Sequence, residues 1–179
     1  RLNEGGDRCP SLHLIGTEHG SNPILDACRS LGLSGSMSHD KFIPDDYKFN
    51  SAEVRLAVLQ GVMDADGWVQ GKGRHTCFAS ASEALVDDVA FLIQSFGGTA
   101  KKSAKETSYT VDGEKHSGRT SYTLTVTLPA EINPFRIERK AGAVVPKTKY
   151  KPVRYIVSVE PIGLKPAQCI RVSDPSRLY

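Results

Sequence analysis

Hydrophobic residues recur along this chain with two different periods, and segments of the two kinds alternate. Between residues 51 and 66 and between 83 and 96, apolar side chains return every three or four positions, which predicts two helices. From Ser121 to Leu128, apolar residues alternate with serine and threonine, which predicts a strand with one buried and one polar face. The other predicted elements are strands at 68–70, 75–81 and 99–110 and short helices at 23–31 and 134–141.

The predicted elements after residue 50 follow the order helix, two strands, helix, two strands, helix. This order is typical of an α+β fold in which helices cover one face of an antiparallel sheet. A polar loop that holds Asp112 and Gly113 is predicted between the last two strands. Residues 34–50 show no period and are predicted to form a connector anchored by Phe42.

The two ends of the chain differ from this central unit. Residues 1–20 are polar and rich in glycine, and the first residue is Arg1, so we expect the natural N-terminus to lie upstream. Strand patterns at 154–160 and 169–172 are separated by a proline-containing turn, which indicates a β element that the chain enters without finishing.

Composition places the chain among globular proteins. Of its 179 residues, 39% are hydrophobic and only 10 are proline. No apolar run approaches the length of a membrane span and no signal-peptide pattern is present, so we expect a cytoplasmic protein without a membrane partner. The four cysteines are far apart and form no CxxC pair, which favours reduced thiols over a zinc site.

The net charge of +3 says little, but the charge is unevenly distributed. Residues 134–154 hold seven basic side chains against the single acid Glu138. Such a stretch favours contact with a polyanion. A solvated linker has the same composition, so both interpretations stay open.

The helix predicted from Ser51 ends in two aspartates and a glycine, and its apolar surface is broad. Gly61 inside it costs about 1 kcal/mol relative to alanine, which the close approach of another helix would offset. The segment 59–67 resembles the LAGLIDADG signature at Leu59, Gly61, Asp64, Ala65, Asp66 and Gly67, with Gln60, Val62 and Met63 at its variable positions.

The resemblance extends to other parts of the chain. Residues 41–44, 55–56 and 80–98 look like the DOD-type endonuclease found inside inteins, and 156–160 with 169–172 and 178–179 look like the start of an intein's C-terminal splicing block. The implied fold is a LAGLIDADG half-domain, αββαββα with a saddle-shaped antiparallel sheet, followed by β-strands of a Hint-type splicing domain. The implied domains are the end of a preceding half-domain with a connector (1–45), a second half-domain (46–150) and the start of the splicing segment (151–179).

In this family two such helices pack along a seam of small residues, and their acidic ends meet beside the sheet. The resemblance implies that Asp66 is a metal ligand, that the Ala65 carbonyl is an accessory ligand and that Asp64 is a structural carboxylate at the helix end. The implied ion is Mg²⁺ or Mn²⁺, since a divalent cation activates water and stabilises the transition state of phosphodiester hydrolysis. The helix seam comprises Leu59, Gly61, Val62, Asp64 and Gly67.

Polar residues at alternate positions of the strands are the expected contacts to double-stranded DNA. These are Gln70, Lys72, Arg74, Thr76, Lys101, Ser103, Lys105, Thr123 and Thr125, whereas His75 is expected on the inner side. The resemblance also places Arg139 or Lys140 near the cleavage centre, where either could stabilise charge or orient water. Which of the two acts, or whether both are a surface pair, stays open.

The sequence thus predicts an intein-encoded homing endonuclease that makes metal-dependent double-strand cuts at a specific DNA site. The alternatives are a LAGLIDADG-fold module that binds DNA without cutting and an intein with a vestigial endonuclease. Only one acidic motif is present, so we expect the first in an upstream half-domain, or a second copy of the chain to supply it. We also expect host exteins as partners before splicing, and no activity from this segment alone.

Overall fold

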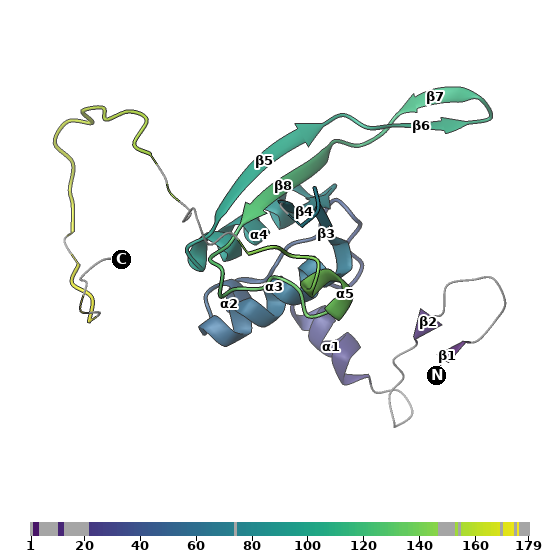
Figure 1. Cartoon of the computed structure of the whole chain (residues 1–179), viewed down its shortest axis with the longest axis horizontal. Coiled ribbons are helices and arrows are strands. Elements are labelled where there is room, and N and C mark those ends of the chain that lie inside the picture. The colour runs from purple at the N-terminus through teal and green to yellow at the C-terminus, as the bar shows by residue number, and fades with distance from the viewer. Residues whose placement is uncertain are drawn as a thin grey trace.

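A computed structural model describes residues 2–3, 11–12, 22–73, 75–146, 153, 155–168, 170–173 and 175. Its elements are β1 (Leu2–Asn3), β2 (Ser11–Leu12), α1 (Pro23–Ser30), α2 (Asp45–Lys48), α3 (Ala52–Asp66), β3 (Gly67–Gln70), β4 (His75–Ser80), α4 (Glu83–Ser95), β5 (Thr99–Lys105), β6 (Ser108–Val111), β7 (Glu114–Ser117), β8 (Ser121–Thr127) and α5 (Glu138–Ala141). Figure 1 shows their arrangement in space.

The central unit is a four-stranded antiparallel sheet with the order β3-β4-β8-β5. Helices α3 and α4 lie against one face of this sheet (Figure 1). The core between them is closed by fully buried side chains from both helices and from the middle strands, among them Leu59, Met63, Phe78, Val89, Leu92 and Leu124. The predicted α+β class with helices on one face of an antiparallel sheet is therefore confirmed.

Serine and asparagine side chains set the starts of the three longer helices. The Leu25 amide donates to the side chain of Asn22 at 3.1 Å, and the Leu85 amide donates to Ser82 Oγ at the same distance. The Val54 amide donates to Ser51 Oγ at 3.4 Å. Each contact satisfies one of the amides that the first turn of a helix leaves without a partner. These starts match those predicted from the sequence.

The connector between α1 and α3 is anchored by Ile43 rather than by Phe42. Ile43 is 4% exposed, whereas Phe42 is 37% exposed. The Ile43 amide donates to Asp88 Oδ2 at 2.8 Å, and Lys48 donates to Asp88 Oδ1 at 2.7 Å. The bonds of the Lys48 ammonium group to Asp88 and to Asp45 raise the pKa of Lys48. The sequence has no apolar period here because the connector, including the unpredicted α2, is held by polar contacts to α4.

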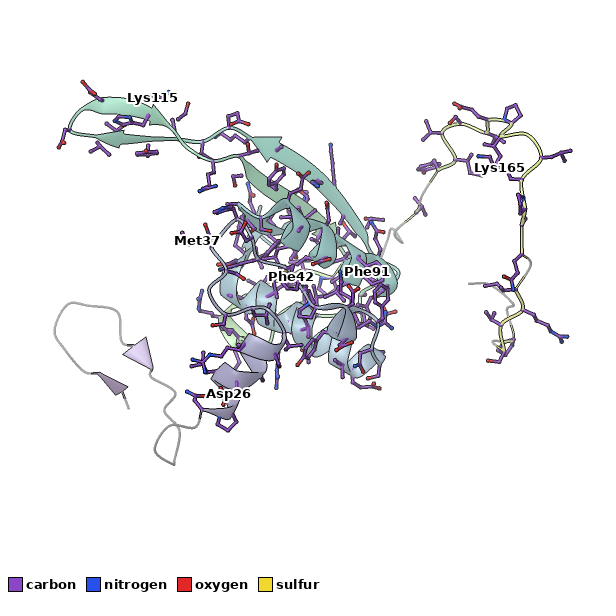
Figure 2. The ribbon with its side chains drawn as sticks, turned by 180° about the vertical axis from the view of Figure 1, so that it is seen from behind. Asp26, Met37, Phe42, Phe91, Lys115 and Lys165 are labelled. Atoms are coloured by element: carbon purple, nitrogen blue, oxygen red, sulfur yellow. The ribbon has the colours of Figure 1, made fainter. Side chains whose placement is uncertain are left out.

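A two-stranded ribbon replaces the polar loop predicted between the last two strands. Strands β6 and β7 pair in antiparallel register and extend β5 and β8 past the helices (Figure 1). Asp112 and Gly113 both have positive φ, 51° and 84°, as a two-residue type I′ hairpin turn requires. Tyr109 stacks on His116 with centroids 5.4 Å apart, and Lys115 lies near the tip (Figure 2). Asp112-Gly113 favours such a hairpin turn, and the prediction of a loop did not take this into account.

The predicted C-terminal strands are not confirmed. Residues 155–168 and 170–173 lie in neither helix nor strand, and Val157 is 96% exposed. An isolated strand lacks partners for its backbone groups, so the alternating pattern alone cannot form one. Arg154, Cys169 and residues 176–179 lie outside the described residues, as do 147–152 of the basic stretch. Among the described helices, none is both long and apolar enough to cross a membrane.

Candidate functional site

The end of α3 brings a helix and a strand into unusually close contact. The helix stops at Asp66 because Gly67 adopts an extended conformation and begins β3, while its amide still donates to the Met63 carbonyl. A Cβ atom on Gly67 would lie 2.6 Å from the Met63 carbonyl oxygen. Glycine is therefore required here by close approach of backbone rather than by a positive φ.

The two aspartates of the motif have different surroundings. Asp64 accepts from the Arg136 amide through both carboxylate oxygens at 3.2 Å and from the Ile137 amide at 3.3 Å. The side chain of Asp66 is exposed and makes no hydrogen bond or ion pair with the residues that the structure describes. Residues two apart on a helix point about 200° away from each other, which accounts for this division. Asp64 thus holds a loop, and Asp66 is free to bind a ligand.

A divalent cation fits the end of α3 only as half of a site. Mg²⁺ takes one or two carboxylates together with water and phosphate oxygens. Asp66 provides one carboxylate, and the carbonyl of Ala65 stands beside it at the negative end of the helix dipole. Within the described ranges, no three acidic, histidine or cysteine side chains gather to form a complete metal site. A second carboxylate must come from elsewhere for a two-carboxylate site to form.

The two basic residues predicted near the cleavage centre, Lys140 and Arg139, have different surroundings. Lys140 Nζ donates to the carbonyls of Asp64 and Gly67 at 2.7 Å and lies 3.4 Å from that of Met63. Arg139 is exposed and makes no hydrogen bond or ion pair among the described residues. The sequence could not distinguish these neighbours, because their roles depend on the direction in which the short helix α5 presents each side chain.

A groove runs between α1 and α3, which we call the α1–α3 groove. It has a volume of about 770 Å³, and Asp66 is one of the residues that line it. Its lining includes Pro23, Ile24, Ala27 and Cys28 of α1 and Val58, Gly61, Val62, Ala65 and Asp66 of α3. Leu31, residues of the connector and Leu85 of α4 complete the lining. A Cβ atom on Gly61 would meet no described atom within 4 Å. The helix that was expected to pack closely on Gly61 is therefore not supplied by the described part of this chain.

The sheet face opposite the helices carries most of the predicted DNA contacts. Strand register places Lys101 opposite Thr125 and Ser103 opposite Thr123, with Lys105 further along β5 on the same face. Gln70 is on that face too, and Lys72 lies in the turn between β3 and β4. Arg74 is outside the described residues. We call this surface the outer face.

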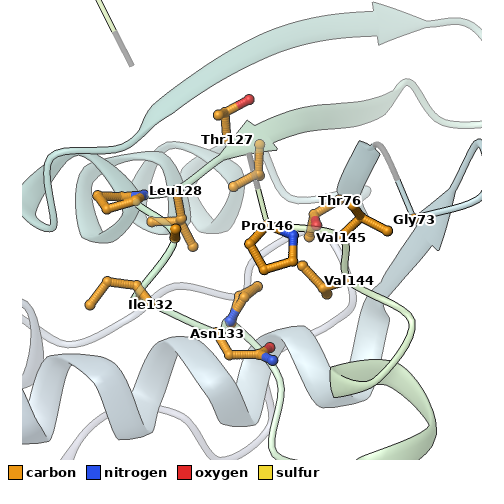
Figure 3. A pocket seen from close by; sticks show the side chains of 13 residues that line it. Gly73, Thr76, Thr127, Leu128, Ile132, Asn133, Val144, Val145 and Pro146 are labelled. Carbon is orange, nitrogen blue, oxygen red and sulfur yellow. The ribbon is translucent and has the colours of Figure 1, made fainter. Parts of the chain in front are cut away.

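Thr76 was expected on the outer face, and this placement is wrong. Thr76 lies opposite Val126 in β8, faces the core and is 7% exposed. Figure 3 shows it in a small cavity with Val144 and Val145. His75 is the exposed residue opposite Gln70, so it takes the outward position. Cys77, Phe78 and Ala79 are consecutive small or apolar residues. The sequence therefore did not show which residues of this strand face the helices and which face outward.

Trp68 also belongs to the outer face, although it was not among the residues predicted there. Trp68 is 37% exposed and lies opposite Cys77, which in turn lies opposite Thr125. Burial raises the pKa of the Cys77 thiol, as expected for a reduced, buried cysteine. Trp68 follows Asp66 by two residues, so its position next to the motif was the available signal.

Comparison with known proteins adds two findings. Residues 53–135 match the model of the LAGLIDADG-like domain. The chain is also 33% identical over 155 residues to the replicative DNA helicase DnaB of Mycobacterium intracellulare. That alignment covers 84% of this chain but 25% of the relative, so the chain spans about a quarter of that protein's length. The domain match ends at Phe135, and α5 with Lys140 lies beyond it.

Proposed function

Since residues 53–135 match a LAGLIDADG-like domain, we propose that the chain is one half of an intein-encoded homing endonuclease that makes metal-dependent double-strand cuts at a specific DNA site. The observation that carries the proposal is the carboxylate of Asp66, which lines the α1–α3 groove and has no partner among the described residues. A second motif helix in that groove would bring a second carboxylate beside Asp66. The two carboxylates would then hold Mg²⁺ or Mn²⁺, which polarises the phosphate and activates water.

The helicase name of the matched relative supports an intein as the setting of this nuclease domain. Unwinding of DNA does not account for a LAGLIDADG-like domain. An intein inserted in a helicase would account for one, because it would place the domain in the same polypeptide. The host exteins of this chain would then be the two parts of a replicative helicase. The described residues 155–168 and 170–173, most of which are exposed, would pair with other strands of the splicing domain.

The polar outer face of the sheet is the proposed DNA-binding surface. Its exposed basic and hydroxyl side chains suit contacts to phosphates and base edges. We include His75 and Trp68 with the predicted residues and leave Thr76 out because it is buried. Arg139 is the proposed cation for transition-state charge, since its side chain is exposed and has no partner among the described residues.

Cleavage of the uninterrupted host gene tests this function. The natural full-length polypeptide is incubated with a duplex spanning the intein-free insertion site, with Mg²⁺ or with EDTA. We expect one double-strand cut that requires the metal. Binding without any nick in Mg²⁺ or Mn²⁺ would instead support the alternative of a non-cleaving DNA-binding module, as would a first motif that lacks its acidic residue.

Adjacent lysines on opposite faces of β5 test the DNA-binding surface. Lys101 is on the outer face, whereas Lys102 faces the helices and pairs with Glu83 at 2.7 Å and Asp87 at 2.6 Å. Lys101→Ala should weaken DNA binding and reduce the slope of log affinity against log salt by about 1. Lys102→Ala is the matched control and should leave both unchanged, as measured by fluorescence anisotropy at several salt concentrations. Equal effects of the two variants would contradict the assignment.

Gly61→Ala tests whether another helix occupies the α1–α3 groove. In the isolated chain the added methyl group meets no atom of the described residues, and alanine favours the helix, so stability should rise by up to about 1 kcal/mol. In the full-length protein the same methyl group should hold the second helix away and lower the cleavage rate. Urea unfolding of the chain and cleavage by the full-length protein measure the two effects. Unimpaired cleavage would show that no helix packs on Gly61.

A further inference from the structure

We propose that Lys140 is a positioning residue, whose ammonium group fixes the backbone of the α3 end and thereby the carboxylate of Asp66, without touching DNA or metal. The proposal rests on the function proposed for Asp66. It differs from the role that family resemblance suggested for this lysine, which was direct action on the reacting phosphate or water.

The ammonium group of Lys140 has its hydrogen-bonding capacity used by the protein. It carries three N–H donors and no acceptor. The carbonyls of Asp64 and Gly67 accept at 2.7 Å, and that of Met63 stands at 3.4 Å. The carbonyls of Met63 and Asp64 belong to the last turn of α3, and that of Gly67 belongs to the first residue of β3. The last carbonyls of a helix lack intrahelical donors, although that of Met63 also accepts from the Gly67 amide. A cation is also favoured there by the helix dipole.

Side chains of α3 also bind the backbone of the segment that leads to Lys140. The Asp64 carboxylate accepts from the amides of Arg136 and Ile137, and Gln60, one turn earlier on the same side of α3, donates to the Asn133 carbonyl at 2.9 Å. Lys140 then returns from α5 to the backbone of α3. Residues 133–140 thus contact α3 at Gln60, at the Asp64 side chain and at its last carbonyls, all within the segment 59–67.

Asp66 lies between the two carbonyls that Lys140 binds most tightly. Its peptide is bracketed by Asp64 and Gly67, while its own carboxylate has no partner among the described residues. The direction of that carboxylate therefore depends on a backbone that Lys140 holds. Lys140 Nζ also lies over the Phe135 ring, 5.6 Å from its centroid, which is a further contact of the ammonium group with the protein.

Hydrogen exchange tests the positioning role without DNA or metal. We compare the 179-residue chain with Lys140→Met, with Lys140→Arg, and with Arg139→Met as the matched control. Both Lys140 variants should exchange amides of residues 64–70 about tenfold faster, which corresponds to loss of one charged helix-end contact. Arginine should not rescue, because its planar fork cannot reproduce three convergent donors. Wild-type exchange in Lys140→Arg would overturn the proposal, and this variant stays informative if Lys140→Met fails to fold.

Cleavage by the full-length protein separates positioning from catalysis. Lys140→Met should need about tenfold more Mg²⁺ for half-maximal rate, approach the wild-type rate at saturating Mg²⁺, and keep the shape of the pH–rate profile. A large rate loss at saturating Mg²⁺, with normal exchange at residues 64–70, would make Lys140 catalytic and overturn the proposal. If no variant or wild-type protein cuts DNA, the proposed function fails, whereas the exchange result still decides how Lys140 acts on α3.

Discussion

Asp66→Asn should abolish cleavage by the full-length protein and leave its DNA affinity unchanged. The carboxylate has no partner among the described residues, so its loss should not weaken the fold. An amide is a poor ligand for Mg²⁺, and a catalytic metal contributes several kcal/mol to the transition state, so we expect a rate lower by about 10³-fold. Single-turnover cleavage at saturating protein gives the rate, and gel-shift titration without metal gives the affinity.

Asp64→Ala is the matched comparison within the same helix turn. This change removes the acceptor for the Arg136 and Ile137 amides, so it should lower stability by about 1 kcal/mol. Its effect on cleavage should follow from that loosening and be smaller than the effect of Asp66→Asn. A full loss of cleavage in Asp64→Ala together with normal cleavage in Asp66→Asn would exchange the roles proposed for the two carboxylates.

Gly67→Ala should have the largest effect on stability among the motif variants. The added Cβ atom would lie 2.6 Å from the Met63 carbonyl oxygen and 3.1 Å from Met63 Cα. Backbone atoms cannot turn aside as a flexible side chain does, so the helix end and β3 must separate. Such overpacking costs about 1–3 kcal/mol. Urea unfolding of the chain measures the loss, and hydrogen exchange at residues 64–70 shows whether it is local.

Gly61→Ala is the control for Gly67→Ala, because the two glycines lie in the same motif with opposite surroundings. The isolated chain should tolerate or gain from alanine at Gly61 and lose stability at Gly67. Equal losses of stability at the two positions would contradict this explanation. They would mean that glycine is required at position 67 by the conformation of the helix rather than by the close approach of backbone atoms.

Local patterns predicted the elements that bury one complete face. Helix α4 and strand β8 have regular periods, and Ser51 and Ser82 give the helix starts. Strand β4 was assigned the wrong phase because Cys77 and Phe78 are both buried although they face opposite sides of the sheet. Strand β7 was missed, and β6 was merged into the end of a single predicted strand at 99–110, because the ribbon is exposed on both faces and β7 has no alternating hydrophobic residues.

The sequence by itself determined the helix that ends in Asp64 and Asp66, since capping, period and the following glycine are local properties. The different surroundings of the two carboxylates were decided only by tertiary structure. Asp64 meets the amides of Arg136 and Ile137, and Lys140 meets the α3 carbonyls, across more than 70 residues of chain. No local pattern records such contacts, because they depend on how β8 returns the chain to α3. Asp66 is left free, and its partner must be sought outside the described residues.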